Sequence, residues 1–87
     1  MGLKSIELIK KERERQISEE GWTAEHDDEH INGELVLAAI CYAFPDLYSK
    51  GYWPWGPDEF KPTTKIKDLI KADALISAEI DRLLRLN

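Results

Sequence analysis

Both histidines of the chain and five of its carboxylates lie within ten consecutive residues, from Glu25 to Glu34. Packing alone does not require so many titratable groups in one short segment. Such a cluster is typical of a metal site, of a proton-transfer site, or of a polar network that fixes the start of a helix. The sequence therefore places the candidate site here, although it does not specify a reaction.

The spacing of this cluster fits a metal site if the segment is helical. His26, His30 and Glu34 follow one another at intervals of four residues, so a continuous helix would place them on one face. Two imidazoles and a carboxylate are a suitable ligand set for a divalent transition metal. Asp27 and Asp28 could add oxygen ligands or orient an imidazole. All five residues are thus candidate metal ligands.

The pair Asn32-Gly33 favours a break in the helix between His30 and Glu34. Asn32 or Asp28 would then cap the next helix, and the spacing argument for a metal would no longer apply. In this alternative, an aspartate caps a helix and the histidines pair with nearby carboxylates. A third alternative is that the histidines contact a ligand directly.

A second group of candidates lies in the segment 45–63, which holds all four prolines and five of the eight aromatic residues of the chain. Aromatic rings stack on nucleobases, and neighbouring lysines can bind phosphate. The alternative is that these rings complete a small hydrophobic core. The candidate ligand-binding residues are Trp22, His26, His30, Tyr52, Trp53, Trp55, Lys61 and Lys65.

Hydrophobic spacing and capping residues predict three principal helices that would carry these sites. The first runs from about residue 5 to residue 20 and ends at Gly21, and Thr23 caps a short turn after it. The second covers about residues 31 to 44, is apolar nearly all round, and is expected to be central. The third runs from about residue 65 to 86 and is capped by Thr63 or Thr64. Its expected apolar stripe consists of Ile66, Leu69, Ile70, Ile76, Ile80, Leu83 and Leu84, with Asp73 at its centre and Leu75 pointing the other way.

Length and charge narrow the class of protein. Eighty-seven residues form one domain, 1–87, with a modest core, so a homo-oligomer is expected. Between Gln16 and Ser49 there are eight acids and no Lys or Arg, which argues against binding to a nucleic-acid polymer. The sequence predicts no membrane span or export signal. With only one cysteine, Cys41, the cytoplasm is the expected compartment.

An ordered set of motifs resembles a small protein that is widespread in bacteriophages and prophages. The resemblance covers nearly the whole chain, although Asp73 stands where related sequences carry a small residue, often Gly. The motifs are Glu12-Arg13-x-Arg15-Gln16, Glu20-Gly21-Trp22, His26-Asp27-Asp28-x-His30, Gly33-Glu34-Leu35, Ala38-Ala39-x-x-Tyr42-Ala43, Trp53-Pro54-Trp55, Lys61-Pro62 and, in the last helix, residues 68–83.

The resemblance implies an accessory protein made in the cytoplasm of an infected bacterium. Such proteins commonly act against host defences, and one class captures nucleotide-derived immune signals without cleaving them. The expected function is therefore sequestration of a small nucleotide-type signal by an all-α homo-oligomer, with no required cofactor. Two alternatives are a protein-binding inhibitor of a host factor and a metal-dependent nucleotide hydrolase.

The hydrolase alternative follows from a weaker resemblance to the all-α nucleotide pyrophosphohydrolases of the MazG type. Carboxylates on two packed helices can bind magnesium ions for pyrophosphate hydrolysis. The second acidic motif of those enzymes is broken here, because Arg82 stands where an acid is expected after Glu79. In the hydrolase alternative, the divalent metal is held by the five candidate ligands His26, Asp27, Asp28, His30 and Glu34. A further set of candidate carboxylates consists of Glu12, Glu19, Glu20 and Glu34.

Overall fold

The computed structural model describes residues 3–86 and is all-α, as the sequence predicts. The three long helices are α1 (Leu3–Glu19), α3 (Glu34–Ala43) and α5 (Lys65–Arg85). Between them lie the short helices α2 (Ala24–Asp28) and α4 (Asp46–Ser49) and the 3₁₀ turn η1 (Pro57–Glu59). No strand occurs in residues 3–86, and no helix in that range is long and apolar enough to cross a membrane.

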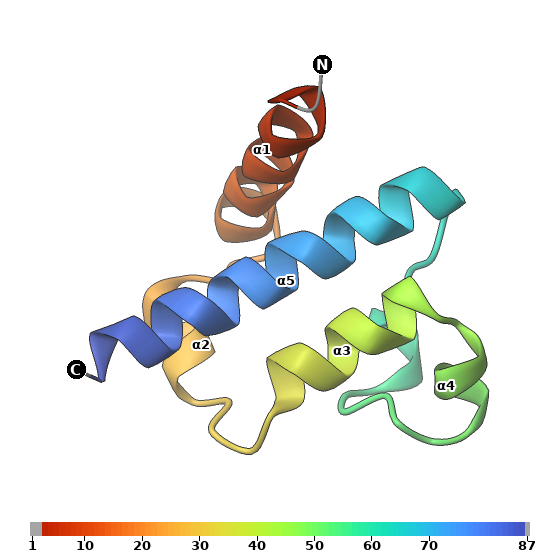
Figure 1. Ribbon diagram of the computed structural model, residues 1–87. Helices are drawn as coiled ribbons and strands as arrows, with labels where there is room; N and C mark the ends of the chain where they lie inside the picture. Colours follow the sequence, from red (N-terminus) through yellow and green to blue (C-terminus); the bar gives the residue numbers. More distant parts are fainter. Residues whose placement is uncertain (1–2, 87) are drawn as a thin grey trace.

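The central element is α5, and not the helix expected over residues 31–44. It packs against α3 along one side and against α1 along another, and α2 lies beside its C-terminal half (Figure 1). The helix α3 is buried on one side only, with Val36 and Ala43 exposed. Its apolar composition therefore gives it both a core face and an outward face.

Local signals at the helix ends are largely confirmed. Gly21 has a φ of 74° and lets the chain turn so that the N–H of Trp22 donates to the carbonyl oxygen of Gln16 at 3.0 Å. The Thr23 hydroxyl accepts from the N–H of His26, and the Thr64 hydroxyl caps α5 by accepting from the N–H of Lys67. These short polar contacts fix where α1 ends and where α2 and α5 begin.

The cap expected for α3 is wrong, because neither Asn32 nor Asp28 occupies it. Gly33 is the N-cap residue and has a φ of 82°, a left-handed conformation that favours glycine. In place of a side-chain cap, the Glu34 carboxylate accepts from the N–H of Asn32 at 2.7 Å. The helix is thus interrupted between His30 and Glu34, as the Asn-Gly pair predicted.

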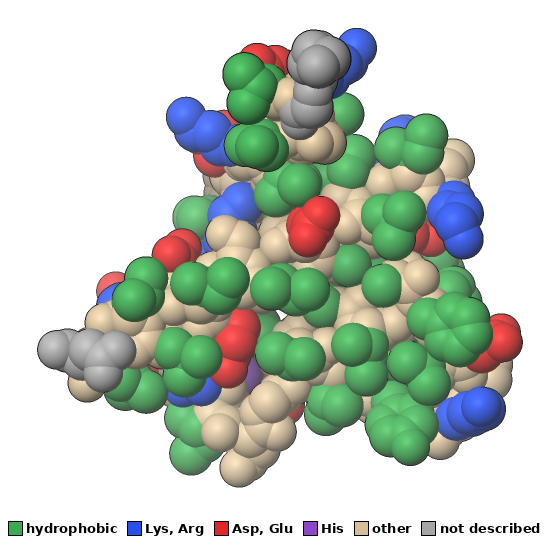
Figure 2. All heavy atoms as spheres, in the orientation of Figure 1, with side chains coloured by type: hydrophobic (Ala, Val, Ile, Leu, Met, Phe, Trp, Pro, Cys, Tyr) green, Lys and Arg blue, Asp and Glu red, His purple; other side chains and the backbone are tan. Residues whose placement is uncertain are grey.

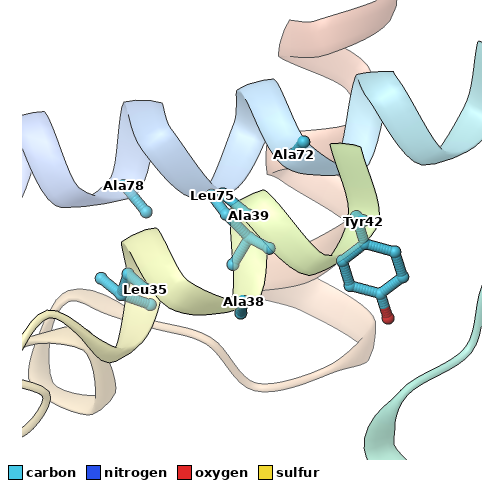
Figure 3. Close-up of a cluster of buried hydrophobic side chains, with 7 residues drawn as sticks. All are labelled: Leu35, Ala38, Ala39, Tyr42, Ala72, Leu75 and Ala78. Carbon is cyan, nitrogen blue, oxygen red and sulfur yellow. The ribbon is translucent and has the colours of Figure 1, made fainter. Parts of the chain in front are cut away.

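The core forms where α3 runs alongside α5 in the opposite direction (Figure 3). Much of the contact is made by alanines, which allow the two helix backbones to approach closely. Leu35 and Leu75 are the largest apolar side chains with no exposed surface. The cluster consists of Leu35, Ala38, Ala39, Tyr42, Ala72, Leu75 and Ala78.

The face of α5 that was expected to be buried points outward. The buried residues of α5 include Asp68, Ala72, Leu75, Ala78 and Arg82, while Asp73 is exposed. The large residues of the expected stripe are mostly exposed or half-buried. The helix therefore carries two apolar faces, and the one with small residues is used because it permits close packing.

The connector between α3 and α5 is folded onto the core, in agreement with the alternative that its rings complete a small hydrophobic core. The rings of Tyr48 and Phe60 stack at 4.2 Å, and Trp53 packs against Phe60 and against Tyr42 of α3. The Tyr42 hydroxyl accepts a hydrogen bond from the N–H of Lys61 at 3.0 Å. A core residue thereby fixes the position of the connector near its end.

Candidate functional site

The histidines and two carboxylates of the acidic segment form a row. His26 Nδ1 lies 3.0 Å from Oδ1 of Asp27, and His26 Nε2 lies 3.4 Å from His30 Nε2. At the far end, His30 Nδ1 lies 3.8 Å from Oε2 of Glu34. The order Asp27, His26, His30, Glu34 is kept although the helix is broken before Glu34, which is the first residue of α3.

Both ends of this row are held by further contacts. Arg13 of α1 donates to Oδ2 of Asp27 at 2.6 Å, and Asp27 has no exposed surface. At the other end, hydrogen bonds from the N–H groups of Glu34 itself and then of Asn32, together with the nearby His30, outweigh burial and lower the pKa of the Glu34 carboxyl. The carboxylates therefore have fixed positions next to the imidazoles.

Two tryptophans bring the connector to this row. The Trp22 ring stacks parallel to the His26 imidazole at 6.0 Å, and Trp55 lies 5.1 Å from His30 and 5.8 Å from Trp22. A small cavity of about 110 Å³ lies among these four rings and Glu59. The acidic segment and the tryptophan corner thus meet at one place, although this cavity alone is smaller than a typical small-molecule site.

A larger recess adjoins this cavity, because Trp22 and Glu59 line both. Its volume is about 250 Å³, and α1, the connector and α5 all contribute to it. Tyr42 forms part of the wall. The charged and polar residues that line it are Glu12, Arg15, Gln16, Glu20, Lys61, Thr63 and Lys71, together with Glu59.

Three of the charged side chains in the recess are paired with one another. Arg15 binds both carboxylate oxygens of Glu12 at 2.8 Å and reaches Glu20 at 3.4 Å. The hydrogen bonds that Arg15 donates to Glu12 raise the pKa of Arg15. Burial raises the pKa of Glu12, but Arg15, Gln16 and Lys71 outweigh burial and keep that pKa below its usual value. The recess consequently holds ionised groups of both signs side by side.

Gln16 differs from its neighbours in having an unsatisfied oxygen. Its side-chain nitrogen donates to Glu12 at 3.2 Å, but its buried Oε1 accepts no hydrogen bond. Gln16 is only 1% exposed. A buried polar atom without a partner costs about 1–3 kcal/mol, so its presence in a stable core requires an explanation.

The predicted ligand-binding residues are partly brought together. Trp22, His26, His30 and Trp55 line the small cavity, and Lys61 lines the recess.

The other three predicted residues lie apart. Trp53 packs in the aromatic core and donates from Nε1 to the carbonyl oxygen of Gly56 at 2.9 Å. Tyr52 is exposed. Lys65 lines a different cavity, which it shares with Tyr42 and Asp68.

The five predicted metal ligands do not converge on one point. Asp28 pairs with Arg85, with 2.7 Å between Oδ1 of Asp28 and Nη2 of Arg85, and Asp27 binds Arg13. Across residues 3–86, no three side chains of His, Cys, Asp or Glu are gathered as a metal ion requires. Of the carboxylates considered for magnesium, Glu12 and Glu20 share Arg15, whereas Glu34 pairs with His30.

Several residues of the site were not predicted from the sequence. Arg13, Arg15 and Gln16 are polar residues of the first helix, and neither their types nor their spacing connects them to the site. Lys71 and Glu59 come from α5 and from η1, and nothing in their local sequence connects them to α1. Comparisons of the chain with protein-family models, with curated proteins and with solved structures give no match.

Proposed function

We propose that the protein binds a small nucleotide-type molecule in the recess between α1, the connector and α5, and sequesters it. The observation that carries this proposal is the unpaired, buried Oε1 of Gln16, a residue that lines the recess together with Trp22. A ligand with an N–H group, such as a nucleobase amine, would satisfy this oxygen once the side chain turns toward it. Trp22 offers a ring on which a base can stack.

The cations of the recess suit the phosphate of such a ligand. Lys61 and Lys71 line it together with Arg15, and the Lys71 ammonium already donates to the carbonyl oxygen of Lys61 at 2.6 Å. The neighbouring acids keep the net charge low, which disfavours a long polyanion and favours a small ligand with few charges. The volume of the recess, about 250 Å³, also favours a small ligand.

Sequestration is favoured over hydrolysis because two of the three carboxylates that line the recess are already engaged. Glu12 and Glu20, which could otherwise activate water, both bind Arg15. Cys41, the one cysteine, is buried in α3 and does not line the recess. The resemblance to phage accessory proteins supports a nucleotide-derived immune signal of the bacterial host as the ligand.

Calorimetry with a panel of cyclic nucleotides and ADP-ribose derivatives tests the proposal. We expect one member to bind, and Trp22→Ala to weaken that binding by about 5- to 150-fold, the equivalent of 1–3 kcal/mol of stacking. Tyr52→Ala, which removes an exposed aromatic ring away from the recess, is the matched control. Lys61→Ala against Lys65→Ala makes the same comparison for the phosphate.

Mass spectrometry of the bound molecule distinguishes capture from catalysis. A ligand that is released unchanged after denaturation of the protein supports sequestration. A converted ligand, or the absence of heat with every member of the panel, contradicts it.

A further inference from the structure

The two histidines face each other at a distance that suits a shared metal ion. Their Nε2 atoms lie 3.4 Å apart. Two nitrogens bound at about 2.0–2.1 Å to one tetrahedral zinc ion are on the order of 3.4 Å apart. The distance between the two Nε2 atoms therefore equals one edge of a zinc coordination tetrahedron.

The opposite nitrogens of both rings are directed at carboxylates. Asp27 lies 3.0 Å from His26 Nδ1, and Glu34 lies 3.8 Å from His30 Nδ1. Metal-binding histidines almost always donate their second N–H to such a group, which fixes the tautomer and the ring orientation. The parallel Trp22 ring holds the plane of His26 as well.

We propose that His26 and His30 bind Zn²⁺ or a similar transition-metal ion through their Nε2 atoms. Glu59, which lines the same small cavity from the exposed η1 turn, and water complete the coordination. Glu59 must rotate toward the histidines to do so, since it does not stand in a three-ligand arrangement with them. Asp27 and Glu34 are positioning residues in this site.

Metal binding changes which nitrogen atoms of the two imidazoles carry hydrogen. Without metal, one Nε2 carries a hydrogen and donates it to the other. Coordination needs both Nε2 lone pairs, so each neutral ring must carry its hydrogen on Nδ1 and direct it to Asp27 or Glu34. Binding thus replaces the hydrogen bond between the rings and strengthens the contacts with both carboxylates.

Titration of the full chain with ZnCl₂, followed by calorimetry and by ¹⁵N NMR of the imidazoles, tests this site. We expect one ion per chain and a large shift of both Nε2 resonances but not of Nδ1. His30→Ala should abolish binding, and Glu34→Gln should weaken it about 10- to 100-fold. Asp28→Asn, which changes a neighbouring acid that pairs with Arg85, is the control.

Two results would overturn the metal site: Nε2 resonances that stay unchanged in millimolar ZnCl₂, or unchanged affinity in His30→Ala. The NMR measurement uses the unmodified protein, so it decides the matter even if a variant does not fold. The nucleotide proposal is tested by different residues and ligands and does not depend on this result.

A second inference comes from the outward face of α5 and α3, the two helices that pack most extensively against each other. This outward face consists of Ile66, Leu69, Ile76, Ile80 and Leu83 of α5 with Val36 and Phe44 of α3. Each of these side chains is between 40% and 70% exposed. Figure 2 shows hydrophobic side chains spread over α5 and α3 with few charged groups among them.

The extent of the outward face matches an interface between two proteins. From the exposures of its seven residues, the outward face amounts to roughly 600–700 Å², which approaches the about 800 Å² that each partner contributes to a standard interface. The largest apolar patch of a monomer is usually about 300–600 Å². We infer that a second copy of the chain covers this face.

The spacing along α5 supports self-association in an antiparallel direction. Ile66, Leu69, Asp73, Ile76, Ile80 and Leu83 follow one another at alternating steps of three and four residues, as in a coiled-coil seam. The order of steps is the same in both directions, so two antiparallel copies match along the whole seam. This arrangement sets each Asp73 beside Ile76 of the other copy and keeps the two carboxylates from meeting.

Sedimentation velocity across a concentration series tests the dimer. We expect twice the monomer mass at about 100 μM, and Ile80→Glu should shift the dissociation constant upward by about 100-fold or more, because it buries a charge at the interface. Ile6→Glu, at an exposed isoleucine of α1 outside the outward face, is the control. A monomer at every concentration, or equal effects of both variants, would contradict the inference.

Discussion

Arg13 Nη2 lies 2.6 Å from Oδ2 of Asp27, and both side chains are largely withdrawn from water. The pair links α1 to α2 and fixes the carboxylate that orients His26. Arg13 also donates to the carbonyl oxygen of Trp22 at 3.2 Å. One guanidinium therefore positions both the histidine row and the tryptophan that lines the recess.

Removing this guanidinium should destabilise the fold strongly. Arg13→Met leaves the Asp27 carboxylate buried without its cation, which costs about 3–5 kcal/mol. Chemical denaturation monitored by circular dichroism measures the change. Lys10→Met, an exposed lysine on the same helix, should change the free energy of unfolding by less than about 0.5 kcal/mol. Equal effects of the two variants would show that the pair adds nothing.

Glu12 should make stability depend on pH in the acid range. Because its pKa is lower in the folded chain than the ordinary value of 4.5, its contribution is present above pH 4.5 and is lost as pH falls through the folded value. Glu12→Gln should remove about 0.5–1 kcal/mol at pH 7 and flatten the dependence below pH 5. Glu14→Gln, at an exposed position of α1, should leave the dependence unchanged.

Cys41 should be unreactive in the native protein. The thiol has no exposed surface, and burial raises its pKa above the ordinary value of 9.0. Labelling with a thiol reagent at pH 8 should be at least about 100-fold slower than in denaturant, since it requires an opening of the core. The raised pKa also predicts that the stabilising effect of the neutral thiol is lost as pH rises above 9. Rapid native labelling would contradict both statements.

The Tyr42 hydroxyl should hold the connector in place. Tyr42→Phe removes the acceptor of the Lys61 N–H and should cost about 0.5–1.5 kcal/mol. Hydrogen exchange at the Lys61 amide should accelerate more than exchange elsewhere in the chain. Tyr52→Phe alters an exposed tyrosine and should change neither quantity. Unchanged exchange at Lys61 would mean that the rings alone hold the connector.

Gly33 should resist substitution although there is space around it. A Cβ at Gly33 would meet nothing within 4 Å, so the strain of Gly33→Ala comes only from its φ of 82°. The expected loss is about 1–2 kcal/mol. Gly56 has equal space but a φ of −65°, and Gly56→Ala should be neutral or slightly stabilising. Comparison of the two unfolding midpoints isolates the backbone term.

The helices were predictable because their signals are local. Gly21, Thr23 and Thr64 act through contacts within a few residues, so the sequence alone places the ends that they fix. The choice of buried face on α5 was not predictable in this way. Hydrophobic periodicity selects the largest apolar residues, whereas the fold buries Ala72 and Ala78 because close helix contact needs small ones.

The candidate site was predictable only where its residues are close in the chain. His26, His30 and Glu34 could be grouped by spacing, and their order in the structure follows from it. The recess depends on Gln16, Glu59 and Lys71, which come from three separate segments. Their proximity results from the crossing of α1 over α5, which no short-range pattern records.

The hydrogen bond between Tyr42 and Lys61 has a kinetic consequence. It joins residues 19 positions apart and closes the connector between α3 and α5 into a loop. The conformational entropy of this loop is lost during folding. The walls of the recess are then in place before any molecule arrives. Binding of the proposed ligand should therefore follow a single exponential, and its rate should rise linearly with ligand concentration. A slow closing step would instead produce a plateau.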